Sequence, residues 1–326
     1  MPLSITDTVY PGTVEAGFMI TKATFGLESV KKGCVYVKDG IKKAHNIPNL
    51  DITNVLQTRS AIPTSNGTFS IDKVTITPQD AMGYVEFNPR DFESHFYAEQ
   101  LSPTLLAREL PVTAENFMMQ LFLNRCFESI EQCIHMGSLG YTTNLLPAQS
   151  SGQLKFFDGF IRKALVGNAL QVATPVAITS VNILSKMDLA IALLPKAIQT
   201  SMNKYKEVKF MLSVDDFQNF EIASLALPQK GRDVNGITIM NYRGYEIVTL
   251  AGLPKDTFYL ARAFAGIDSN MWIGTNSLED LNIELMRLQN NAELFFVKSL
   301  FKFDTQIAKL SEFVIYTTKT TATFIA

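Results

Sequence analysis

Residues 113–136 read Thr-Ala-Glu-Asn-Phe-Met-Met-Gln-Leu-Phe-Leu-Asn-Arg-Cys-Phe-Glu-Ser-Ile-Glu-Gln-Cys-Ile-His-Met, and this stretch decides the fold. Its apolar side chains recur at steps of three, four and seven residues, a spacing that keeps them on one face of an α-helix. They are Met119, Leu123, Cys126, Phe127, Ile130, Cys133 and Ile134. At about 1.5 Å per residue the helix would run about 36 Å, the width of a small domain. We therefore expect a spine helix with sheets packed along it.

The residues at both ends support a helix of this length. Thr113 is a good N-cap, and Glu115 suits the positive end of the helix dipole. Gly137 and Gly140 follow the last apolar residue and are expected to end the helix.

The composition of the 326-residue chain limits what it can be. Hydrophobic residues make up 47% and charged residues 18%, which is enough for a sizeable core and argues against disorder. The net charge of −2 argues against a free-standing nucleic-acid-binding protein, although one surface could still face nucleic acid. The 23 phenylalanines and 10 tyrosines also fit apolar surface buried between subunits.

The three cysteines indicate a reducing compartment. Cys126 and Cys133 are seven residues apart on one helix, too far for a bridge, and Cys34 is remote in sequence. The N-terminus lacks a signal-peptide pattern, and no apolar run is long enough to span a membrane.

Enzyme and metal motifs are missing from the sequence. Gly137-Ser138-Leu139-Gly140 has the wrong spacing for a nucleophile elbow, and Ile237 stands where a phosphate-binding loop needs lysine. Cys133 and His135 are two positions apart on the helix and cannot chelate one metal together. We therefore expect no catalytic, cofactor-binding or metal-binding residues and no cofactor.

The acidic and basic pairs carry no clear chemistry. The adjacent carboxylates Asp215-Asp216 and Glu279-Asp280 suit helix caps or turns better than acid–base catalysis. Lys31-Lys32 and Lys42-Lys43 are interpreted as solvated charge, with contact with acidic neighbours or nucleic acid as the alternative.

The N-terminal quarter predicts extended structure. Residues 1–33 show no sustained period and fit an extended arm, with a frayed terminus as the alternative. A short strand at 34–37 is followed by a polar stretch at 38–70 and by a strand at 74–77. This order suggests a long two-stranded projection, and such a hairpin is marginal without a surface to lie on.

The rest of the chain predicts mixed α and β structure. Alternation continues through 281–286, although a helix over 292–303 competes with the strands there. The expected strands are 81–87, 208–212, 237–239, 245–250, 257–261, 294–297, 300–303 and 313–316. The expected helices are 90–97, 156–164, 182–194 and 213–225, and loops are expected at 137–153 and 228–236.

Four stretches of the chain carry a resemblance to a known family. They are Phe156-Phe157-Asp158-Gly159-Phe160-Ile161, Asn182-Ile183-Leu184, Met271-Trp272-Ile273-Gly274-Thr275-Asn276 and Leu288-Gln289-Asn290-Asn291-Ala292-Glu293-Leu294-Phe295-Phe296-Val297-Lys298. These stretches resemble the major capsid proteins of tailed bacteriophages, and they are most similar to those of phages that infect Bacteroidota, including crAss-like phages. The resemblance covers nearly the whole chain.

The resemblance implies an α+β chain with the HK97-like fold, named after phage Hong Kong 97. Its parts would be an N-terminal arm (1–33), an extended loop (34–80), a peripheral domain with the spine helix (81–180 and 256–326) and an axial α/β domain (181–255). It further implies self-assembly as pentamers and hexamers into an icosahedral shell in the host cytoplasm. The shell would enclose double-stranded DNA without sequence-specific binding, with scaffolding, portal and decoration proteins as partners and no membrane.

Two alternatives stay open from the sequence. An encapsulin-type nanocompartment shares the fold but would hold protein cargo. A cytosolic α/β hydrolase would need a nucleophile and a base brought together by the fold, and the sequence identifies neither.

Overall fold

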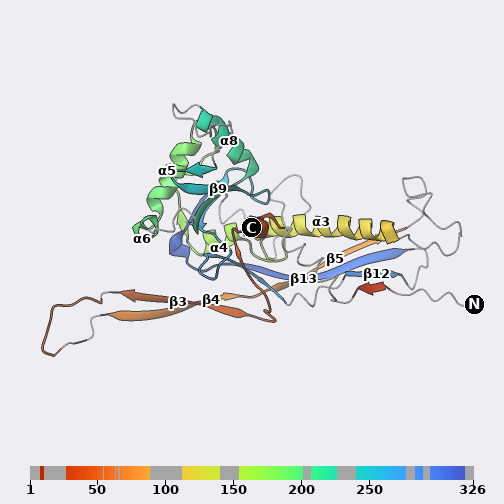
Figure 1. The fold of residues 1–326 in the computed structure, drawn as a ribbon, viewed down its shortest axis with the longest axis horizontal. Helices are drawn as coiled ribbons and strands as arrows, with labels where there is room; N and C mark the ends of the chain where they lie inside the picture. Colours follow the sequence, from red (N-terminus) through yellow and green to blue (C-terminus); the bar gives the residue numbers. More distant parts are fainter. Residues whose placement is uncertain are drawn as a thin grey trace, which may run out of the picture.

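The computed structural model describes residues 8–10, 27–53, 55–62, 64, 67–88, 112–139, 154–200, 207–225, 240–276, 283–288 and 294–319. These residues form two six-stranded sheets and a separate two-stranded hairpin. Figure 1 shows a long helix beside one sheet and the hairpin extending away from the body. Among the described residues, no helix is long and apolar enough to cross a membrane.

The first sheet, here called the spine sheet, is built around its longest strand, β13. Strands β11 and β12 pair with β13, and β5 pairs with it separately. Its strands are β1 (Thr8–Tyr10), β2 (Tyr36–Lys38), β5 (Gln79–Phe87), β11 (Met271–Thr275), β12 (Ile283–Arg287) and β13 (Phe295–Ile307). The sequence divided β13 into two strands and weighed a helix over 292–303, and both interpretations are wrong. Buried Val297, Ser299, Phe301 and Phe303 alternate without a break, which suits one continuous strand.

The predicted spine helix is confirmed as α3 (Val112–Met136). Of the predicted apolar face, five side chains are buried, while Cys126 and Phe127 are partly buried. The N-cap prediction is wrong, because the helix starts at Val112 and Thr113 lies inside the first turn. Gly83 lets β5 approach the helix closely, since a Cβ there would lie 2.7 Å from Phe122 Cζ.

The short helix after the spine begins later than predicted. The sequence favoured 156–164, but α4 spans Phe160–Val166. Residues 156–159 instead turn against the end of α3, where the Gly159 amide donates to the Gly137 carbonyl at 2.8 Å. A Cβ on Gly159 would lie 2.6 Å from the Cys133 carbonyl oxygen, so this approach requires glycine.

The second sheet lies between two helical layers. One face packs on α5 (Ile183–Leu193) and α8 (Val214–Leu225), and the other packs on α4 and the end of α3. Its strands, in spatial order, are β6 (Leu170–Gln171), β14 (Phe313–Thr317), β10 (Thr257–Arg262), β7 (Val208–Leu212), β9 (Tyr245–Thr249) and β8 (Asn241–Tyr242). Every residue of β7 and β14 is buried because both faces of the sheet are covered.

Most elements predicted for this part of the chain are confirmed. Helix α5 begins after Asn182 and ends before Pro195, and Ser213 caps α8 by accepting the Asp216 amide at 3.1 Å. This part of the chain also contains two short helices, α6 (Lys196–Gln199) and the 3-10 helix η4 (Leu310–Glu312). Strands from the predicted ranges 181–255 and 256–326 share the second sheet, and the domain boundaries themselves stay a prediction.

The predicted two-stranded projection is confirmed as the hairpin of β3 (His45–Thr53) and β4 (Thr68–Ile76). Strand β4 continues almost directly into β5, so the hairpin extends from the spine sheet. The strand predicted at 34–37 is displaced to β2, because the Cys34 amide donates to the Ser29 carbonyl at the end of α2 and pairing with β11 begins only at Tyr36.

The expectation of an arm without packed elements is wrong near its end. Helix α2 (Glu28–Lys31) forms one turn, and Leu27 and Ser29 are buried. Several predictions lie outside the described residues, namely Glu115 as a side chain, Gly140, Leu281, the helix at 90–97, most of the loop at 137–153, the loop at 228–236 and the strand at 237–239.

Candidate assembly surfaces

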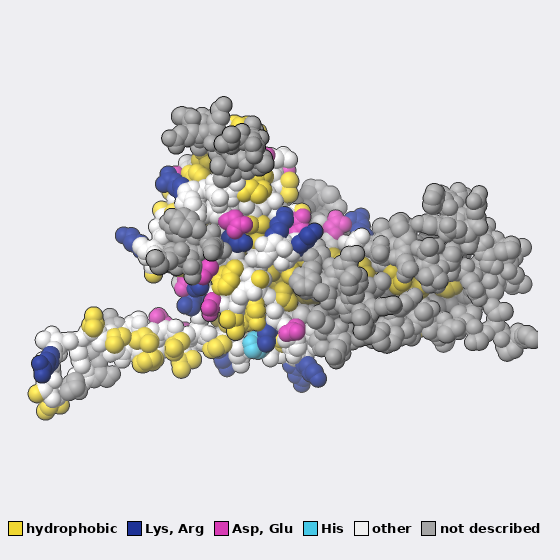
Figure 2. All heavy atoms as spheres, in the orientation of Figure 1, with side chains coloured by type: hydrophobic (Ala, Val, Ile, Leu, Met, Phe, Trp, Pro, Cys, Tyr) yellow, Lys and Arg dark blue, Asp and Glu magenta, His cyan; other side chains and the backbone are white. Residues whose placement is uncertain are grey.

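The outer half of the hairpin carries an exposed apolar face. Cross-strand pairing places Leu50 opposite Ile71 and Ile52 opposite Phe69, so the four side chains share one face. Their exposed fractions are 56%, 74%, 43% and 70% in that order. Figure 2 shows apolar side chains in yellow along the projecting hairpin. The sequence description of 38–70 as polar missed this face, although its alternation was visible in β3 and β4.

The base of the hairpin is held by the opposite face. Ile47 and Ile76 are buried in a small core with Ile41 and Trp272. Because Ile47 and Ile76 alternate with the exposed residues along β3 and β4, the hairpin attaches to the body with one face and leaves the other uncovered.

Polar contacts fix the direction in which the hairpin leaves the body. The Asp304 carboxylate accepts the Thr77 amide at 2.8 Å and pairs with the Lys163 ammonium group at 2.7 Å. The Asn49 side chain donates to the Ala308 carbonyl at 2.7 Å, and Gln306 donates to the Thr75 carbonyl at 2.9 Å. These four interactions form the hairpin clamp, which orients an element that has little core of its own.

A second exposed apolar strip lies on the spine sheet. Met82 pairs with Leu300 across β5 and β13, and both are about half exposed, at 54% and 51%. Tyr84 lies two residues along the same face, and its ring contacts Phe296 at a centroid distance of 5.6 Å. Ala81 on the other face packs toward the main core, so this strip faces away from it.

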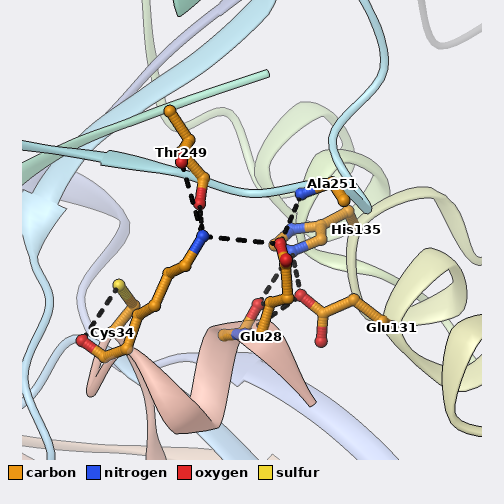
Figure 3. A network of polar contacts seen from close by, with 8 residues as sticks. Glu28, Cys34, Glu131, His135, Thr249 and Ala251 are labelled. Atoms are coloured by element: carbon orange, nitrogen blue, oxygen red, sulfur yellow. Dashed lines mark hydrogen bonds and ion pairs between the residues drawn. The ribbon is translucent and has the colours of Figure 1, made fainter. Parts of the chain in front are cut away.

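A buried polar network joins α2 to the spine helix (Figure 3). The Ser29 hydroxyl oxygen lies 2.5 Å from Glu131 Oε1 and 2.9 Å from His135 Nε2. In a catalytic triad the serine and the carboxylate contact different nitrogens of the histidine ring. Here Glu131 Oε1 lies 3.3 Å from the same Nε2, and Nδ1 has no hydrogen-bond partner among the described residues. Ser29 and His135 are fully buried, so this arrangement supports a structural role.

The residues weighed for chemistry that the structure describes are dispersed, and Ile237, Glu279 and Asp280 lie outside the described residues. Among the described residues, no group of three or more His, Cys, Asp or Glu side chains is placed to hold a metal ion. Burial raises the pKa of Cys34 and Cys133 to about 12 and that of Cys126 to about 11, which disfavours reactive thiolates. Asp216 is buried beside the Asp256 and Thr257 amides, and Asp215 lies in the first turn of α8.

The basic pairs differ in their surroundings. Lys42 and Lys43 are exposed, and Lys32 donates to the Thr249 carbonyl at 2.6 Å. Sequence reasoning missed Ser29 and Asp304, because their partners are distant in the chain. The spacing of Glu131 and His135, four residues apart on one helix, was a signal that could have been used.

The solved structures that resemble this chain are phage or phage-like capsid proteins. No protein-family model matches the chain, and no curated protein does either. The capsid of the native GTA particle is 11% identical, with a TM-score of 0.58 over 89% of each chain. The satellite phage P4 procapsid is 9% identical, with a TM-score of 0.55 over 91% of this chain and 97% of that one. The capsid of Myoviridae phage XM1 is 11% identical, with a TM-score of 0.55 over 89% of this chain and 91% of that one. The chain therefore has the HK97-like fold of phage capsid proteins.

Proposed function

We propose that this chain is a major capsid protein that assembles as pentamers and hexamers into an icosahedral shell enclosing double-stranded DNA. The observation that carries the proposal is the apolar face of the hairpin, which stands clear of its own body in a chain with a capsid fold. A monomer gains nothing from four exposed apolar side chains on a two-stranded hairpin. A neighbouring copy would supply the missing cover.

The apolar strip on the spine sheet is a suitable partner for this face on the adjacent copy. The two surfaces belong to different parts of the chain, so their contact is head-to-tail and can close into rings. Such rings are the pentamers and hexamers that an icosahedral shell requires. The arm, extended loop, peripheral and axial ranges given above remain our proposed division of the chain.

The proposed shell holds its DNA by confinement. With a net charge of −2 the subunit cannot neutralise a genome, and any local attraction to lysines is screened within about 8 Å at physiological salt. The purified subunit should therefore bind duplex DNA negligibly at physiological ionic strength. A sub-micromolar, salt-sensitive affinity in a fluorescence anisotropy titration would contradict this.

The proposal also covers the partner proteins and the place of assembly. We propose separate scaffolding, portal and decoration proteins, assembly in the host cytoplasm, location in the virion and a non-enzymatic role. We also propose kinship with capsid proteins of Bacteroidota phages, including crAss-like phages, on the sequence resemblance. The structural matches to the phage capsids favour a virion shell over an encapsulin.

Electron microscopy of the purified protein tests the proposal. Negatively stained wild-type protein, concentrated alone or with a crowding agent, should show closed shells or rings of five and six subunits. The variant Leu50→Ser/Phe69→Ser should stay folded and unassembled. Its matched control, Val181→Ser, changes a 91% exposed apolar residue away from both surfaces and should assemble. A wild-type protein that stays monomeric under all these conditions would overturn the proposal.

A further inference from the structure

The buried network on α2 has a defined direction of hydrogen bonding. The Ser29 hydroxyl carries one hydrogen, and the 2.5 Å distance assigns it to Glu131 Oε1. Ser29 Oγ must then accept from His135 Nε2–H at 2.9 Å. The Ser29 amide donates to the same carboxylate oxygen at 3.1 Å. Ser29 therefore connects the spine-helix histidine to the spine-helix carboxylate.

The carboxylate at the centre of the network is stabilised in its charged form. Burial opposes the charge on Glu131, but two donors from Ser29 and the His135 Nε2–H, which Ser29 Oγ and Glu131 Oε1 share, outweigh burial and lower the pKa of the carboxyl. Removing a donor would leave a buried charge short of partners. Such a loss is costly, so the seat of α2 on the spine helix depends on Ser29.

Helix α2 also contacts the loop between β9 and β10. The Glu28 carboxylate accepts the Ala251 amide at 2.8 Å, and Lys32 donates to the Thr249 carbonyl. The loop itself touches the network, because a Cβ on Gly252 would lie 2.7 Å from the Glu131 carbonyl oxygen and 2.8 Å from His135 Cδ2. Figure 3 shows Glu28, Thr249 and Ala251 gathered at this turn of helix, beside Glu131 and His135.

Helix α2 cannot be stable by itself. It has four residues, and Leu27 at its N-cap provides no side-chain hydrogen bond. A single turn without a cap does not persist in water, so its order depends on contacts with the spine helix and the loop. An element of this kind opens before the cores on either side of it.

We propose that α2 is a releasable latch that couples the N-terminal arm to the β9–β10 loop through the spine helix. When α2 is seated, the loop is ordered against α3; when α2 leaves, the loop loses both Glu28 and its packing on the network. The loop leads from β9 to β10 inside the second sheet, so the latch links arm position to that sheet. The inference concerns the subunit itself and does not require the proposed shell.

Hydrogen exchange of the folded subunit, measured by mass spectrometry, tests the latch. Ser29→Ala should raise the exchange rate at residues 30–34 and at 251–253 by at least about tenfold, with β7 unchanged. The matched control is Ser299→Ala, which removes a fully buried hydroxyl that has no hydrogen-bond partner among the described residues. It should leave both segments unchanged.

The reciprocal variant separates coupling from local damage. Glu28→Ala breaks the link to Ala251 on the partly exposed side of α2, so it should fold even if Ser29→Ala does not. It should speed exchange at residues 252 and 253, whose amides Glu28 does not itself accept. Coupling is reciprocal, so Gly252→Ala in the loop, whose Cβ would lie 2.7 Å from the Glu131 carbonyl oxygen, should speed exchange of the Cys34 amide, which donates to the Ser29 carbonyl. Faster exchange confined to the segment that carries the substitution, in the variants that fold, would overturn the coupling. Unchanged exchange in both segments would overturn the latch.

Discussion

Apolar side chains are buried in the second sheet and exposed on the hairpin. Phe210 in β7 is fully buried between two helical layers, whereas Phe69 in β4 is 70% exposed. Both lie in strands, and both face apolar neighbours across the strand. The difference is that the described residues cover Phe210 and leave Phe69 exposed. The second sheet is therefore stabilised within the subunit, whereas the proposed shell would have to supply the contact that covers the hairpin face.

The largest expected effect lies in the second sheet. Phe210→Ala should lower the free energy of unfolding by about 3–5 kcal/mol, because it leaves a cavity among Tyr242, Tyr245 and Phe258. Chemical denaturation of the subunit measures the change. The matched substitution Phe69→Ala should change the same quantity by no more than about 0.5 kcal/mol. If Phe210→Ala and Phe69→Ala lower the free energy of unfolding equally, the contrast between the second sheet and the hairpin is wrong.

The hairpin clamp should give the next largest effect. Asp304→Asn removes the charged partner of Lys163 and leaves it with the Thr305 carbonyl, at a site where both side chains are largely buried, and should cost about 3 kcal/mol. The nearby pair of Lys302 and Asp80 serves as a control, since the Asp80 side chain is 83% exposed. Asp80→Asn should cost less than about 1 kcal/mol by the same denaturation assay. If the two variants lose equal stability, the clamp does not hold the hairpin base.

A smaller effect should appear as a pH dependence of the second sheet. Burial raises the pKa of Asp216 from 3.8 to about 6, so the folded state binds its proton more tightly than the unfolded state. The contribution of this group to stability is then fully present below pH 3.8 and is lost as pH rises through about 6. The stability of wild type relative to Asp216→Asn should fall between those two pH values. A relative stability that rises over that interval would show that the carboxylate is favoured in the fold.

The smallest effect on subunit stability should come from the hairpin face, although its effect on assembly should be the greatest. Leu50→Ser/Phe69→Ser should keep the free energy of unfolding within about 0.5 kcal/mol of wild type, while light scattering shows no shells. A large loss of subunit stability would mean that the exposed face packs within its own subunit.

Local patterns predicted the elements that depend on neighbouring residues. The spacing of Met119, Leu123 and Ile130 gave the spine helix, and Ser213 and Pro195 marked where helices begin and end. The length and thin core of 38–70 gave the projecting hairpin. The fold class came from the resemblance of particular stretches to phage capsid proteins, and the structural matches agree with it.

Features that depend on distant partners could not be read from the sequence. Ser29 meets Glu131 across 102 residues, and Thr77 meets Asp304 across 227. The local signal for α2 is weak, a Glu28–Lys32 pair four residues apart, and its order comes mainly from contacts elsewhere. The late start of α4 has the same origin, because the close approach of Gly159 to the end of α3 is a tertiary constraint.

Hydrogen exchange of the hairpin in two states tests the central claim most directly. The amides of the outer half, 50–53 and 68–71, should exchange rapidly in the isolated subunit, because two strands with both faces uncovered hold them weakly. In the assembled shell the same amides should exchange at least about a hundredfold more slowly, while those of β7 should be protected in both states. Equal, strong protection of the hairpin in the subunit and in the shell would contradict the account.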